Sequence, residues 1–115
     1  MTPNKPLIDK KIIVDLLYGD EEYVNEFLEA SVESFTEFKN NFEKNLESRD
    51  DQALRNAGHK IKPIAQMLHL DPIIEMYEKS KELLEEEASD SEIEELIKKM
   101  TTYCDKLVSD LHNMK

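Results

Sequence analysis

The sequence predicts an all-α protein: an antiparallel up-down four-helix bundle with a short additional N-terminal helix. Three observations predict this fold class. The 115 residues include only two glycines and four prolines, and Glu, Lys and Leu are abundant, which favours helices. Apolar residues recur at helical spacing in four long segments, and no segment has the two-residue alternation of a strand. Short polar connections join the segments, as between antiparallel helices of a bundle.

Each predicted helix begins after a residue whose side chain can accept a hydrogen bond from the free N–H groups of the first turn. The predicted helices are 10–18 after Asp9, 21–47 after Asp20, 51–68 after Asp50, 72–87 after Asp71, and a fifth after Ser91 with its apolar stripe ending at 111. Ile8 and Ile13 are spaced as a hydrophobic staple, and Ser91 with Glu94 as a capping box. Pro72 suits a first helical position, where no N–H partner is lost.

The apolar stripes predict one core shared by all the long helices, so that residues 1–115 form a single domain. The predicted core positions are Val24, Phe27, Leu28, Val32, Phe35, Phe38, Phe42 and Leu46; Leu54, Ala57, Gly58, Ile61, Ile64, Ala65 and Leu68; Ile73, Met76, Tyr77, Leu83 and Leu84; and Ile93, Leu96, Ile97, Met100, Tyr103, Cys104, Leu107, Val108 and Leu111.

Composition excludes several classes of function. The net charge of −11 argues against binding to nucleic acid or an anionic membrane, because phosphate contacts need a positive face. The sequence has no apolar run long enough for a membrane span, and its start does not resemble a signal peptide. With glycine only at positions 19 and 58, no Gly-rich nucleotide loop can form. A single cysteine, Cys104, excludes an internal disulfide and suits the cytoplasm.

The third predicted helix differs in charge from the rest of the chain. Residues 52–70 contain no Asp or Glu, although the chain has 26, and they carry three cations, Arg55, Lys60 and Lys62. The other residues hold 12 basic and 26 acidic side chains, a charge of −14. The sequence therefore predicts a locally positive surface on an acidic protein.

Helical geometry predicts which side chains share that surface. His59 lies about 200° around the helix from the core residue Ile61, so it should point to solvent. The residues at helical spacing around it are Arg55, Asn56, Lys62, Pro63 and Gln66.

Two further residues of this segment have distinct roles: Gly58, next to His59 in the chain, and Pro63, on the same face as His59. Gly58 is in phase with the core, where a missing side chain lets a neighbouring helix approach closely. Pro63 removes the hydrogen bond to the His59 carbonyl, but the apolar residues before and after Pro63 keep the same helical spacing. We therefore expect one helix, kinked between His59 and Pro63.

The segment Ala53–Lys62 resembles the centre of a histidine phosphotransfer (HPt) domain, in which one helix of a four-helix bundle carries a phosphorylatable histidine and a lysine three residues later. His59 and Lys62 match these two positions. With the Gly19-Asp20 pair and the aromatic stripe of the second helix, the resemblance extends over about residues 8–111. The sequence departs from the family at Pro63 and His69, where glycine is usual.

The resemblance implies that His59 carries a phosphoryl group to or from an aspartate of a response-regulator receiver domain, and that Lys62 stabilises charge on the phosphoryl oxygens. A hybrid sensor histidine kinase would be the other partner. The receiver would hold the Mg²⁺, so this chain would need no cofactor or metal and would be a monomeric cytoplasmic carrier, not an enzyme. The predicted phosphate and partner contacts are Arg55, Asn56, Lys60, Pro63, Gln66 and Met67.

Residue chemistry supports phosphotransfer and also leaves alternatives open. An imidazole is partly neutral near pH 7, so a ring nitrogen can attack phosphorus. One alternative is a helical adaptor that binds a signalling partner without being phosphorylated. Another is a metal site using His59, His69 or His112 with carboxylates, although these histidines lack the i, i+4 spacing of helical ligands. The simplest role for His69 and His112 is to complement the negative ends of helices.

Overall fold

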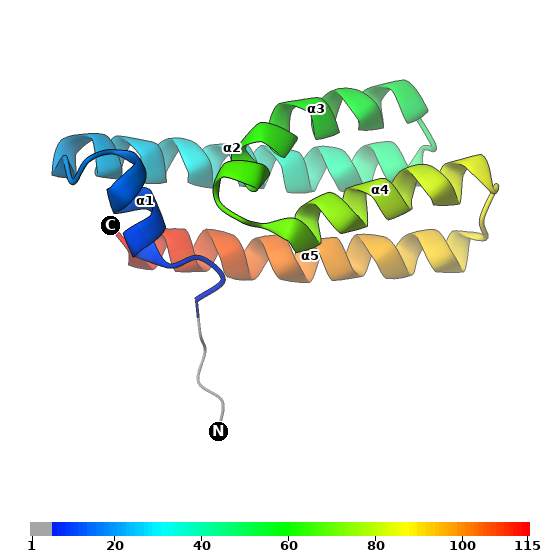
Figure 1. Ribbon diagram of the computed structural model, residues 1–115. Helices are drawn as coiled ribbons and strands as arrows, with labels where there is room; N and C mark the ends of the chain where they lie inside the picture. The colour runs from blue at the N-terminus through cyan, green and yellow to red at the C-terminus, as the bar shows by residue number, and fades with distance from the viewer. Residues whose placement is uncertain (1–5) are drawn as a thin grey trace.

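A computed structural model describes residues 6–115, and this part of the chain is all-helical, with five helices and no strand. The helices are α1 (Lys10–Leu16), α2 (Glu21–Glu47), α3 (Asp51–Met67), α4 (Asp71–Glu85) and α5 (Asp90–Asn113). Helices α2 to α5 lie side by side, with α1 across one end (Figure 1). The prediction of an all-α fold class is confirmed.

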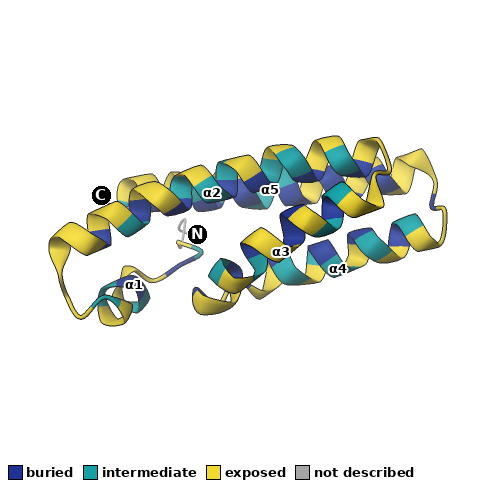
Figure 2. Ribbon diagram, turned by 90° about the horizontal axis from the view of Figure 1, so that it is seen from above, coloured by how far each residue is buried: buried dark blue, intermediate teal, exposed yellow. Residues whose placement is uncertain are grey.

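Each of the four long helices packs against two of the others. Helix α2 packs on α3 and α5, and α4 packs on the same two helices, while α1 rests against α2. Figure 2 shows each long helix buried along one side and exposed along the other, as amphipathic sequences require. Helix α3 therefore has a neighbour on either side of its exposed face.

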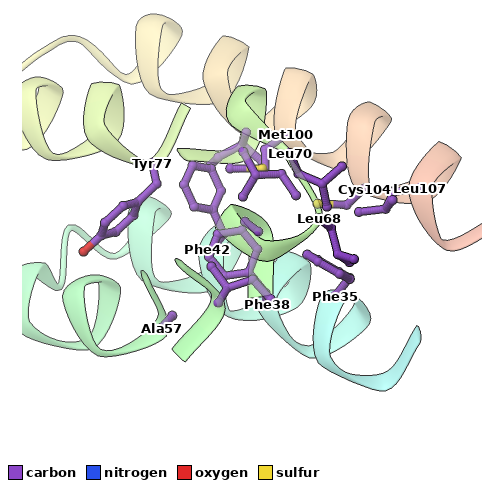
Figure 3. Close-up of a cluster of buried hydrophobic side chains, with 14 of the residues drawn as sticks. Phe35, Phe38, Phe42, Ala57, Leu68, Leu70, Tyr77, Met100, Cys104 and Leu107 are labelled. Carbon is purple, nitrogen blue, oxygen red and sulfur yellow. The ribbon is translucent and has the colours of Figure 1, made fainter. Parts of the chain in front are cut away.

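Side chains from α2, α3, α4 and α5 meet in one buried cluster (Figure 3). Within it the rings of Phe38 and Phe42 lie 5.7 Å apart between centroids, in a tilted pair. Most predicted core positions are buried, and seven are half-buried at its margin: Phe27, Val32, Ile64, Met76, Leu84, Tyr103 and Val108. The core also takes in residues outside the predicted stripes: Ile8, Ile13, Ser31, Leu70, Ser80 and Ala88.

Cys104 belongs to this core and is fully buried, as its phase on α5 predicts. Burial raises the pKa of the Cys104 thiol to about 12, because the thiolate would lose its hydration. The side chain is therefore a packing group rather than a reactive thiol.

Three aspartates cap helices as predicted. Asp9 accepts a hydrogen bond from the backbone N–H of Lys11, and Asp20 accepts bonds from the first turn of α2. Asp50 accepts from Ala53 at the start of α3. Ile8 and Ile13, the predicted staple around Asp9, are both buried.

Two predicted caps are wrong. The N-cap of α4 is Leu70, with no side-chain hydrogen bond, and Asp71 is already helical. Leu70 is fully buried, so packing sets this helix start. The N-cap of α5 is Ser89, which accepts from Glu92, and not Ser91. The chain reversal after α4 is complete at Ala88, so the helix can begin two residues earlier than predicted.

The four turns between helices have the same backbone conformation and hydrogen-bond pattern. Each contains a non-glycine residue in the left-handed region: Tyr18, Arg49, His69 and Glu87, with φ between 53° and 59°. The residue that follows donates its N–H to a carbonyl five positions earlier, as Leu70 does to Ala65 at 2.8 Å. This is the Schellman motif, which usually has glycine at the left-handed position.

Among the described residues, no helix has the length and apolar character needed to cross a membrane.

Replacing His69 with glycine should stabilise the protein. The left-handed region costs an L-residue about 1–2 kcal/mol, and glycine removes that strain while losing part of the gain to its greater freedom when unfolded. We expect a net increase of about 0.5–1 kcal/mol in the free energy of unfolding, measured by urea denaturation.

His69→Ala is the matched control, because it removes the same imidazole and keeps the strained φ. Equal stabilities for the glycine and alanine variants would contradict the argument.

Candidate functional site

Helix α3 is continuous from Asp51 to Met67 and passes through Pro63 without a break. The prediction of a single helix is therefore confirmed, whereas the bend near Pro63 stays a prediction. Pro63 is exposed, as is His59 one turn before it. The residue that lacks an N–H and the carbonyl that loses its partner thus share the solvent face of the helix.

Gly58 and Tyr77 fix the position of α3 against α4. Gly58 is buried, and a Cβ added there would overlap the Tyr77 ring. The Tyr77 hydroxyl donates a hydrogen bond to the Arg55 carbonyl at 3.4 Å. Burial raises the pKa of Tyr77, so the phenol keeps its proton at neutral pH and remains a donor. The predicted close approach at Gly58 is therefore confirmed, with Tyr77 as the residue that uses it.

The burial of Gly58 turns the adjacent His59 outward, as predicted. The side chains at helical spacing around it form the exposed face of α3. Asn56, Gln66 and Met67 are exposed, and Met67 is 47% accessible although it is apolar. The Asn56 side-chain oxygen accepts a hydrogen bond from Gln52 at 3.1 Å, which leaves its amide N–H groups free to donate elsewhere.

Each cation of the exposed face lies near a carboxylate. Arg55 pairs with Asp51 at 2.9 Å, and this hydrogen bond raises the pKa of Arg55. Lys60 Nζ lies 3.9 Å from a carboxylate oxygen of Glu37 on α2. The expected positive surface is therefore partly neutralised: Asp51 at the start of α3 and acids of the neighbouring helices supply the carboxylates that residues 52–70 lack.

Lys62 has the corresponding partner on the other side of α3. Its Nζ lies 3.9 Å from a Glu78 carboxylate oxygen on α4, and both side chains are a little over 40% exposed. Glu78 also pairs with Lys81 at 2.9 Å. The hydrogen bond from Lys81 lowers the pKa of Glu78, and the charge of Lys62 lowers it further, so the carboxylate is ionised at neutral pH.

Sequence reasoning missed Glu37, Glu78 and Lys81 as neighbours of this face. Helical periodicity identifies the buried side of each helix, but it does not say which residue of the next helix stands at the same height. Once α3 and α4 are known to meet at Gly58 and Tyr77, the next residue, Glu78, falls beside Lys62. The pairing is therefore a product of tertiary packing.

The three histidines lie apart from one another in the described part of the chain. Within residues 6–115, no group of three or more His, Cys, Asp or Glu side chains is placed to hold a metal ion. His69 lies in the turn after α3, and His112 lies in the last turn of α5. The metal-binding alternative therefore has no support in the described structure.

A scan against protein-family models and searches of curated proteins and of solved structures find no match to this chain.

Gly58→Ala should destabilise the protein, contrary to the usual effect of this substitution. Alanine is about 1 kcal/mol better than glycine inside a helix, but here its methyl group overlaps the Tyr77 ring. We expect a loss of about 1–3 kcal/mol in the free energy of unfolding, as for overpacked cores, measured by urea denaturation.

The same substitution in a Tyr77→Leu background separates the overlap from other effects. With the ring removed, Gly58→Ala should be neutral or stabilising relative to Tyr77→Leu alone. A gain in stability in the wild-type background would show that the close approach does not constrain α3.

Proposed function

We propose that the chain is a histidine-containing phosphotransfer (HPt) protein of a two-component phosphorelay, with α2 to α5 as its antiparallel up-down four-helix bundle. His59 would accept a phosphoryl group from an aspartate of a receiver domain, or pass one to it. The single observation that carries the proposal is His59 itself: an exposed imidazole in the middle of α3, held outward by the buried Gly58.

The surroundings of His59 suit phosphoryl transfer, which depends mainly on positioning and charge stabilisation. Lys62 is three residues away on the same helical face, so its ammonium can reach oxygens of a phosphoryl group on the imidazole. Asn56 and Gln66 are exposed amides that can donate hydrogen bonds to those oxygens or to a partner. Arg55 and Lys60 would steer an acidic partner toward the face, and Pro63 and Met67 would contact it.

In the transfer step, a ring nitrogen of His59 forms a bond to phosphorus as the bond from phosphorus to the aspartate oxygen breaks. The proton of the other ring nitrogen leaves to solvent, and the aspartate is released as a carboxylate. The receiver would supply the acidic pocket and its Mg²⁺. This chain would then be a carrier rather than an enzyme, with no cofactor or metal of its own.

The remaining parts of the proposal follow from the same scheme. The phosphoryl donor to the receiver would be a hybrid sensor histidine kinase. Both partners would place the protein in the cytoplasm, which its single, buried cysteine suits. The protein would act as a monomer, because one exposed histidine is a complete site. It would bind neither nucleic acid nor membrane.

A second candidate is an adaptor of the same fold that binds a receiver but carries no phosphate. Pro63, exposed one turn from His59 where the family usually has glycine, is the observation that favours it. A pyrrolidine ring at this place occupies space that an approaching receiver would use.

Incubation with a phosphorylated receiver domain tests the proposal. We expect acid-labile, base-stable phosphate on the wild-type protein and none on His59→Gln, because a phosphoramidate survives base and breaks in acid. Wild-type protein that binds the receiver but takes up no phosphate would favour the adaptor.

Lys62→Ala should slow transfer by about tenfold, which corresponds to about 1.4 kcal/mol of lost transition-state stabilisation. The measurement is the transfer rate at saturating receiver, with urea denaturation to show that the fold is intact. Lys60→Ala is the control: it should weaken receiver binding and leave the saturated rate unchanged. Equal saturated rates for wild type and Lys62→Ala would exclude a role for Lys62 in the transfer step.

A further inference from the structure

Lys62, the lysine of the candidate site, already has a carboxylate neighbour when no phosphoryl group is bound. Lys62 lies 3.9 Å from Glu78, at a separation typical of a loose ion pair. Exposed pairs of this kind are worth little, because water screens them and both side chains lose freedom. The contact is thus strong enough to bias where the ammonium lies and too weak to hold it against a dianion.

Glu78 itself is anchored independently of Lys62. Lys81 pairs with it at 2.9 Å, and the Lys81 ammonium lies 4.9 Å from the centre of the Tyr77 ring. The Lys81 side chain is only 21% exposed, so its position is better defined than that of Lys62. When Lys62 leaves, Glu78 keeps its closer partner, and no carboxylate is left without a counter-charge.

The position of Glu78 beside Lys62 depends on the contact between Gly58 and Tyr77, which also orients His59. Tyr77 fills the space above Gly58, and Glu78 is the next residue along α4. Turning His59 outward and placing a carboxylate beside Lys62 are therefore consequences of one packing contact.

We propose that Glu78 is a positioning residue for Lys62: its carboxylate holds the ammonium toward α4 in the unphosphorylated protein and releases it to the phosphoryl oxygens on His59. This inference rests on the proposed phosphotransfer function. It goes beyond that function by naming the group against which the phosphoryl group competes for Lys62.

The consequence is that removal of the Glu78 charge should speed phosphorylation. A free Lys62 is available to the incoming anion without first losing a partner. The effect should depend on Lys62 and should fade at high salt, since screening weakens both the ion pair and the attraction of the anion.

Potassium phosphoramidate tests this without any partner protein. A ring nitrogen of His59 forms a bond to phosphorus as the phosphorus–nitrogen bond of phosphoramidate breaks. The leaving group departs as ammonia, which takes up the proton released by the imidazole. The rate of phosphorylation at His59 is measured by site-resolved mass spectrometry of samples kept at alkaline pH, where phosphohistidine is stable. We expect Glu78→Gln to be labelled about two- to fivefold faster than wild type at low salt.

Two further variants make the result specific. Glu37→Gln is the matched control, because Glu37 lies at the same 3.9 Å from Lys60 on the α2 side and its removal changes the net charge equally. It should be labelled at nearly the wild-type rate. In a Lys62→Ala background, Glu78→Gln should have no effect.

The outcomes separate this inference from the proposed function. Equal acceleration by Glu78→Gln and Glu37→Gln, or acceleration that persists without Lys62, would overturn the role of Glu78 and leave His59 as a phosphoryl acceptor. The same holds if Glu78→Gln and wild type are labelled at one rate. No label on His59 in any variant would overturn both.

Discussion

The contact between Gly58 and Tyr77 is the constraint on which the candidate site depends. Because a Cβ at position 58 would overlap the Tyr77 ring, α3 can approach α4 closely only with this one residue turned inward. A helix turns by about 100° per residue, so fixing the direction of Gly58 fixes that of His59. Because this contact requires Gly58 to face α4, it also requires the His59 imidazole to be exposed.

The electrostatics of the site follow from the same geometry. Residues 52–70 contain no acid, yet Lys60 faces Glu37 on α2 and Lys62 faces Glu78 on α4. Exposed ion pairs contribute about 0–1 kcal/mol each, so these contacts add little to stability. In the proposed function, each cation would be available to an incoming anion, and a carboxylate balances its charge until then. A protein of net charge −11 thereby presents three cations on one helix, each beside a carboxylate, rather than an uncompensated positive patch.

The sequence predicted what depends on neighbours along the chain. Helical phase placed Gly58 inward and His59 outward, and aspartate side chains marked the starts of three helices. It failed at the starts of α4 and α5 and in the contacts between helices. The start of α4 is set by burial of Leu70 rather than by Asp71, and the pairing of Lys62 with Glu78 requires the register of two helices. Phosphotransfer by His59 was inferred from a resemblance and stays a prediction.

The position of Pro63 shows how a local rule can be broken at low cost. A proline inside a helix leaves the carbonyl four residues earlier without its N–H partner, and the penalty is largest when that carbonyl is buried. Here the carbonyl belongs to His59, on the exposed face, where water can replace the missing donor. A proline at Ile61 or Ala65 would instead free the carbonyl of Ala57 or Ile61, both in the core. The proline therefore lies on the exposed face of α3, which tolerates it, and in the proposed function a phosphoryl donor would approach the same face.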